Sequence, residues 1–311
     1  MATSFAQMHC VVDLPRGWVN SQMFEAALLR CGDALGNAYT QIIIRISDGC
    51  RLMIDVVIRL LSFCNQIIAT SRRLKLEFSA SSDVMGYLSR MGFFDHLARE
   101  VEVTPNRPLF SGAWTHRGKN NGLVEIERFN RAVEPDQDLP DRLAAAVKNG
   151  CANRSDASAA SSAVSNIFSE LIRNVIDHSQ DNLDAFAALQ TYPQGNIVNV
   201  AVSDSGIGIM GSLRPALVRK GSPDADLNDL DLLLEILRKG VSSLDDPNRG
   251  IGLMASAKSA VRYRADLDVR LPRQRILLRP ANGAYGPSTA YCQDDLALLW
   301  GTHISFALKM H

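Results

Sequence analysis

The stretch IVNVAVSDSGIGI, residues 197–209, is the part of the sequence that decides the fold. It opens with a mainly apolar run, which is typical of a buried strand. Asp204 follows this run directly, and Gly206, Ile207 and Gly208 come next. A carboxylate at a strand end can accept a hydrogen bond from an exocyclic amine, and glycines let a ligand approach the backbone closely. The stretch therefore predicts a ligand site where this strand ends.

The same glycines, together with Gly211, also fit the GxGxxG fingerprint of dinucleotide-binding folds. That fingerprint requires a helix that starts at the glycines inside a βαβ unit. Pro215 and Gly221 interrupt residues 211–223, so we expect no such helix there. The sequence thus does not favour a dinucleotide site.

A long helix is predicted upstream, over residues 155–178, from apolar residues at helical spacing and a Ser-Asp-Ala-Ser start signal. At about 100° per residue, Glu170, Asn174 and Asp177 share one face of this helix. A carboxylate one turn from an amide can hold a water and a hard cation together. The alternative interpretation is an ordinary solvated helix face.

Two further segments contain glycine next to a predicted element. Residues 248–257 read NRGIGLMASA, so Gly250 and Gly252 lead into an apolar helix whose first N–H groups favour an anion such as phosphate. A purely structural helix start is the alternative. The final predicted strand opens with Gly301 and Thr302, which by themselves indicate no function.

Taken together, these segments resemble the ordered boxes of the GHKL ATPase superfamily, which includes gyrase and histidine kinases. ELIRNVIDHS resembles the N box, DSGIGI the first glycine box, RGIGLMASA the second and GTHISF the last. The resemblance covers roughly residues 120–310. It implies a Bergerat-type α/β sandwich that binds ATP and Mg²⁺.

The resemblance also implies roles for individual residues. Glu170 would be the catalytic base that activates water, Asn174 would bind magnesium, and Asp204 would contact the adenine amine. Residues 210–249 would form a mobile lid over the phosphates. The other residues implied at the nucleotide are Asp177, His178, Gly206, Ile207, Gly208, Arg249, Gly250, Ile251, Gly252, Leu253 and Thr302.

Strand and helix signals alternate over the first hundred residues. The run IIIRISDGCRLMIDVVIRLLSFCNQIIATSRRLKLEF, followed by VMGYLSRMGFFDHL, resembles STAS-like domains. That family carries a phosphorylatable Ser or Thr directly after an Asp at the start of its first long helix. Here Asp55 is followed by Val56, so the resemblance implies a binding module that senses or recruits a protein partner.

The predicted fold class is therefore α/β, of α+β type, in two domains. The segment TPNRP and the polar run that follows it mark the boundary between them. We expect a STAS-like domain over residues 1–104, a linker over 105–121 and a GHKL-type domain over 122–311. One helix is predicted over residues 83–100 of the first domain.

Composition narrows the class of protein further. Thirty-three basic residues balance thirty-three acidic ones, which excludes a protein-wide basic surface for nucleic acid. The arginines between residues 262 and 279 are compatible with a local patch that binds nucleic acid, and a solvated arginine-rich hairpin is the alternative interpretation. The six cysteines show no CxxC spacing, so neither disulfides nor zinc is expected. With no apolar run of membrane-spanning length, we expect a cytoplasmic protein.

Three functions follow as hypotheses. The first is an ATP-binding regulatory ATPase that uses slow hydrolysis to reset a lid and a partner interface in signalling. The second is a serine/threonine protein kinase, similar to anti-sigma-factor kinases, that phosphorylates a separate protein. The third is a scaffold that binds ATP without hydrolysing it. No His-Glu phosphoacceptor pair precedes the ATPase-like segment, which argues against two-component signalling. The sequence does not decide between a monomer and a homodimer.

Overall fold

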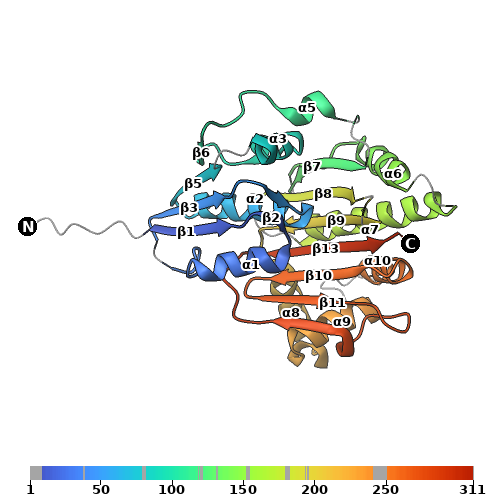
Figure 1. Ribbon diagram of the computed structural model, residues 1–311. Coiled ribbons are helices and arrows are strands. Elements are labelled where there is room, and N and C mark those ends of the chain that lie inside the picture. Colours follow the sequence, from blue (N-terminus) through green and yellow to red (C-terminus); the bar gives the residue numbers. More distant parts are fainter. Residues whose placement is uncertain are drawn as a thin grey trace, which may run out of the picture.

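The chain forms a mixed α/β structure with two main sheets, which lie close together (Figure 1). The computed structural model describes residues 9–37, 39–78, 82–117, 119, 122–130, 132–151, 155–178, 183–192, 194, 196–240 and 251–310. No helix within these ranges is long and apolar enough to cross a membrane.

The first sheet is parallel and has the order β1-β3-β5-β6. Its strands are β1 (His9–Leu14), β3 (Gln41–Ile46), β5 (Arg73–Phe78) and β6 (Glu102–Thr104). A separate parallel pair joins β2 (Gly17–Val19) and β4 (Cys50–Leu52). The helices of this part are α1 (Ser21–Arg30), α2 (Ile54–Ala69), α3 (Ser82–Arg90) and α4 (Phe93–His96). Parallel neighbours follow from the alternation of strands and helices, because each parallel connection needs a crossover.

One predicted element of this part is wrong. We predicted a single helix over residues 83–100, but α3 ends at Arg90 and α4 is a separate short helix. Gly92 lies between them with a φ of 80°, a left-handed conformation that favours glycine and ends the first helix. The break lets Phe93 and Phe94 turn into the core, where both are buried.

The second sheet has seven antiparallel strands in the order β12-β11-β10-β13-β9-β8-β7. Its strands are β7 (Leu123–Phe129), β8 (Ala185–Tyr192), β9 (Ile197–Asp204), β10 (Asp266–Leu271), β11 (Gln274–Leu278), β12 (Ala290–Gln293) and β13 (Thr302–Lys309). The remaining helices of the chain are α5 (Gly112–His116), which packs on α3, and α6 (Leu139–Gly150), α7 (Ala157–His178), α8 (Gly208–Arg219), α9 (Asp229–Lys239) and α10 (Ile251–Arg262), with 3-10 turns at Pro223–Asp226 and Pro287–Thr289.

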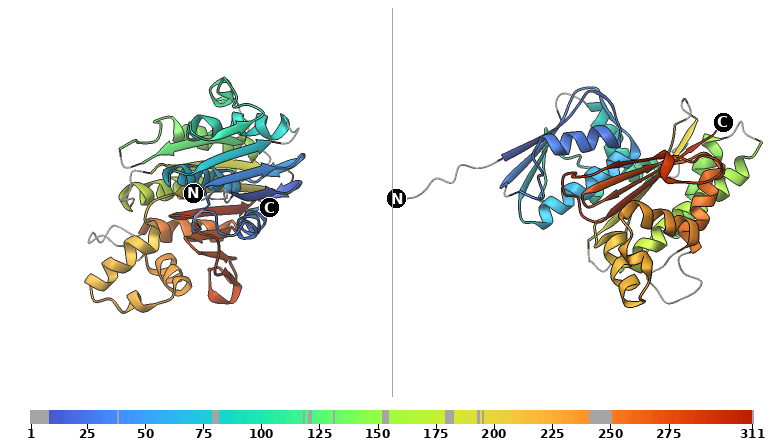
Figure 2. Two further views of the ribbon diagram at one scale, coloured as in Figure 1. Left: turned by 90° about the vertical axis from the view of Figure 1, so that its left-hand side faces the viewer. Right: turned by 90° about the horizontal axis from the view of Figure 1, so that it is seen from below.

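Helices cover both faces of the second sheet, and the helices of the two faces come from different parts of the chain (Figure 2). Helices α6, α7 and α10 pack on one face, whereas α2 of the first hundred residues packs on the other, across β8, β9 and β13. Within β9, Val200 and Val202 join the core beneath α7, while Ala201 belongs to the core around α2. Burial on both faces explains why this strand is almost continuously apolar.

A polar stripe on α2 faces this sheet. Asp55, Arg59, Ser62 and Gln66 recur at helical spacing, and all four are buried. The Ser62 hydroxyl lies 2.7 Å from the hydroxyl of Ser203 on β9. The stripe therefore makes a hydrogen-bonded interface between the first hundred residues and the second sheet.

A buried ionic network continues that interface. Arg270 on β10 makes two 3.0 Å hydrogen bonds to the carboxylate of Glu25 on α1. Asp268 accepts from Arg59 at 2.9 Å and from Arg275 at 2.9 and 2.6 Å. All five side chains are buried. Two members of the arginine cluster near the C-terminus are thus internal structural residues, and the interpretation of that cluster as a solvated hairpin is wrong for them.

Candidate functional site

The ends of β9 and β13 bring two predicted site residues together. Asp204 and Thr302 lie directly opposite each other in these antiparallel strands, and both are buried. The Asp204 carboxylate accepts a 3.0 Å hydrogen bond from the N–H of Gly206. The Thr302 hydroxyl accepts a 2.8 Å bond from the N–H of Ile209. The turn that follows β9 therefore folds back over both side chains, with the predicted residues Gly206, Ile207 and Gly208 in it.

Two glycines make this close folding sterically feasible. Gly208 has a φ of 73°, and a Cβ atom there would lie 2.8 Å from the Thr302 hydroxyl. Gly301 has a φ of 86°, and a Cβ there would lie 1.9 Å from the carbonyl oxygen of Asp204. Any side chain at Gly301 would push the two strand ends apart.

A helix begins at these glycines, contrary to the sequence prediction. Helix α8 starts at Gly208 and continues to Arg219 with Pro215 inside it. The dinucleotide fingerprint still does not apply, because β9 pairs with antiparallel neighbours on both sides and no parallel βαβ unit exists here.

Helix α7 supplies the predicted carboxylate and amide. Glu170 forms an ion pair of 3.0 Å with Arg173, and Asn174 lies one turn further on, partly buried. A Cβ on Gly252 would lie 1.6 Å from Glu170 Oε2, so the first turn of α10 sits directly against this carboxylate. The opposite face of α7 is apolar as predicted, with Val164 and Phe168 fully buried.

Asp204 and helix α7 lie on the same face of the second sheet. Helix α7 packs on β9 and also contacts α8. The end of α7 at His178 precedes the start of β8 at Ala185 by a short connection. Phe186 at that start pairs with Ser203 at the end of β9. The carboxyl end of α7 therefore lies near the strand end that holds Asp204.

Not every predicted residue can be placed. Arg249, Gly250 and the side chains of Asp177, His178 and Ile251 lie outside the described residues. Leu253 is buried in the core, so it packs between helices. Ile207 is 40% exposed at the turn.

The predicted lid is largely helical. Within residues 210–240, α8 and α9 form regular helices, and Leu232, Leu233 and Ile236 are buried in the core. The segment is therefore folded and packed on the core over most of its length, and its movement as a lid stays a prediction. Residues 241–250, which complete the predicted lid, lie outside the described part.

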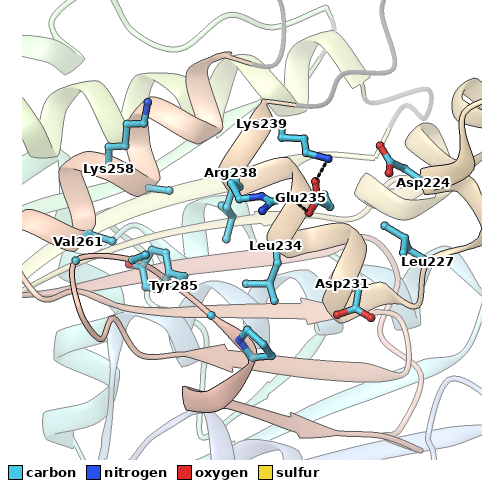
Figure 3. Close-up of a pocket in the computed structure, with 16 residues that line it drawn as sticks. Asp224, Leu227, Asp231, Leu234, Glu235, Arg238, Lys239, Lys258, Val261 and Tyr285 are labelled. Atoms are coloured by element: carbon cyan, nitrogen blue, oxygen red, sulfur yellow. Dashed lines mark hydrogen bonds and ion pairs between the residues drawn. The ribbon is translucent and has the colours of Figure 1, made fainter.

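Sequence reasoning missed a cavity of about 640 Å³ between α9, α10 and residues 283–287 (Figure 3). Leu234 and Tyr285 line it, and Glu235 forms an ion pair with Lys239 at its side. Helix α10 contacts α7 as well as α9, so it lies between this cavity and Glu170. None of the predicted site residues lines the cavity.

The arrangement combines a buried carboxylate and hydroxyl at a strand end with a carboxylate and an amide on the neighbouring helix. Among the described residues, no group of three or more His, Cys, Asp or Glu side chains could hold a metal ion on its own. Comparison with known proteins finds no matching family model, no matching curated protein and no matching solved structure.

Proposed function

We propose that this protein is an ATP-binding regulatory ATPase of the GHKL type, preceded by a STAS-like module that recruits a protein partner. The observation that carries the proposal is the pairing of Asp204 with Thr302 beneath a glycine turn, on the sheet face covered by the helix that carries Glu170 and Asn174. These residues come from three separate segments of the chain, β9, β13 and α7. A shared ligand explains why their order and chemistry resemble the nucleotide-binding boxes.

The strand end would hold the adenine. A carboxylate has acceptor capacity for about four hydrogen bonds; the Gly206 N–H uses one of these at Asp204, and an exocyclic amine would use another. Thr302, directly opposite, would help to hold the ring through its hydroxyl. Burial of both side chains strengthens such bonds, because water competes for them less.

The helix ends would hold the phosphates. The first turn of α10 lies against Glu170. The backbone N–H groups that begin this helix would favour a phosphate at its N-terminal end. The side-chain oxygen of Asn174 fits Mg²⁺, which takes few protein ligands and keeps waters and phosphate oxygens for the rest. When bound, the metal would offset the phosphate charge.

Glu170 would act as the general base. Its carboxylate is partly buried on the face shared with Asn174, and it can hold a water by hydrogen bonding and take its proton. Arg173, in the ion pair with Glu170, would balance that charge beside the phosphates. The expected reaction is slow hydrolysis.

Calorimetric titration with a non-hydrolysable ATP analogue, with and without Mg²⁺, tests the binding. One site per chain with affinity that increases with Mg²⁺ is expected. Asp13→Asn, which alters a solvent-exposed ion pair with Arg45 in the first sheet, serves as a matched control and should bind like wild type. A titration without heat at millimolar nucleotide, supported by a negative competition assay, would refute the proposal.

Incubation with γ-labelled ATP then identifies the reaction. Free labelled phosphate is the expected product. Label transferred to a second protein would indicate the kinase, and intact bound ATP would indicate the scaffold.

A further inference from the structure

The side chain of Gln66 connects α2 to both strand ends of the candidate site. Its amide group donates to the hydroxyl of Ser205 at 2.9 Å and to the carbonyl oxygen of Trp300 at 3.1 Å. Its carbonyl oxygen accepts from the N–H of Trp300 at 2.9 Å. Gln66 is fully buried, so water does not compete for these bonds.

These contacts lie immediately next to the Asp204 and Thr302 pair. Ser205 directly follows Asp204, and Trp300 is two residues before Thr302. Successive side chains of a strand point to opposite faces, so Ser203 contacts α2 while Asp204 lies toward the other face. Gln66 therefore binds the back of the same strand ends whose front carries the candidate site.

We propose that Gln66 is a positioning residue through which the first hundred residues control nucleotide affinity; this rests on the proposed function. The two strand ends approach each other so closely that only a glycine at position 301 fits against the Asp204 carbonyl oxygen. The three bonds of Gln66 join the Ser205 side chain to the Trp300 backbone and so hold the two strand ends in register. Loss of those bonds would let Asp204 and Thr302 move relative to each other.

A chain of buried hydrogen bonds supports the same connection. Ser62 on α2 bonds to Ser203, which bonds to Nδ1 of His303, and Nε2 of His303 lies 3.0 Å from the carbonyl oxygen of Trp300. Gln66 and this chain meet at the same carbonyl. A partner that shifts α2 along the sheet would therefore disturb the strand ends at several points. Binding of the partner and binding of ATP would be thermodynamically coupled, and each would alter the affinity for the other.

The test compares Gln66→Met with Ser21→Ala. The first variant keeps the size of the side chain but removes all three hydrogen bonds. The second removes the buried 2.6 Å bond from Ser21 to Asp55, near the other end of α2. Asp55 and Gln66 are separated by about 16 Å along the helix, so Ser21→Ala removes a buried hydrogen bond of the same helix, between α1 and α2, away from the site.

Gln66→Met is expected to raise the KM for ATP about tenfold, the equivalent of one or two lost hydrogen bonds. The kcat should stay within about twofold, because Glu170 and Asn174 lie on α7. Ser21→Ala should change neither constant. A KM unchanged by Gln66→Met, or raised equally by both variants, would overturn the proposal.

Hydrogen–deuterium exchange of the nucleotide-free protein separates this proposal from the proposed function. Gln66→Met should accelerate exchange in residues 204–209 and 300–303, whereas Ser21→Ala should not. Failure of the wild-type protein to bind ATP would refute the nucleotide site, and with it the control of affinity. The exchange result would still decide whether Gln66 holds the strand ends, and equal exchange in both variants would overturn that as well.

Discussion

The ion pair between Glu25 and Arg270 gives the sharpest prediction about stability. Both side chains are fully buried, and the guanidinium makes two 3.0 Å bonds to the carboxylate. It also donates to the carbonyl oxygens of Leu271 and Ala297. Burial lowers the pKa of Arg270, a shift that Glu25 opposes. Of these hydrogen-bond acceptors, only the Glu25 carboxylate carries a full negative charge, and Glu25→Gln removes it.

The expected cost of Glu25→Gln is about 3–5 kcal/mol in the free energy of unfolding, because one partner of a buried pair is left with uncompensated charge. Native stabilities are typically about 5–15 kcal/mol, so the loss is a large fraction of the total. The double variant Glu25→Leu with Arg270→Met replaces the pair by apolar groups. It should recover most of this loss, since such replacements are often neutral or stabilising.

Urea denaturation, followed by circular dichroism and by tryptophan fluorescence, measures these free energies. Arg45→Gln is the matched control, because Arg45 forms ion pairs with Asp13 and Glu77 that are mostly solvent-exposed. It should cost at most about 1 kcal/mol. A Glu25→Gln loss as small as the control's would refute the reasoning. So would a double variant less stable than the single one.

Three further predictions concern the site and acid stability. Asp204→Asn should weaken ATP binding about tenfold, since an amide has half the acceptor capacity; an unchanged calorimetric Kd would contradict the adenine assignment. Glu170→Ala should bind ATP normally but lose turnover at least a hundredfold, and wild-type phosphate release would remove Glu170 from the mechanism. Burial raises the pKa of Asp268, but two buried arginines outweigh it and lower that pKa to about 2, from an ordinary 3.8. The resulting stabilisation, about 2 kcal/mol, is present above about pH 4 and is lost as the pH falls toward 2. The stability difference between wild type and Asp268→Asn should therefore shrink over that range in urea titrations, and a constant difference would contradict the assignment.

Local patterns in the sequence determined much of the secondary structure. The continuous apolar run before Asp204 predicted β9, and the 3.6-residue period predicted α7 with its buried and polar faces. These predictions depend on neighbours within a few residues, and such neighbours are visible in a sequence. Pro215 misled the same reasoning, because a proline within a helix is tolerated when the surrounding helix packs against the core.

The sequence also predicted site residues that are distant in the chain and that only the fold brings together. Asp204 and Thr302 are far apart in the chain, and their pairing depends on β13 lying beside β9 in one register. The position of Gly252 against Glu170 likewise depends on the packing of α10 on α7. The candidate segments could be chosen from residue types, whereas their positions relative to one another required the sheet.

Only the tertiary structure decided which polar side chains of the helices and strands are buried and which residues they contact. Gln66 and Arg59 on α2 have the composition of a solvated face, yet both are buried against the second sheet. Glu25 meets Arg270 across most of the length of the chain. Periodicity tells which face of an element is apolar, but it carries no information on which distant segment will cover the polar face. That choice is made by the packing of the two sheets, and it places the first hundred residues directly behind the candidate site.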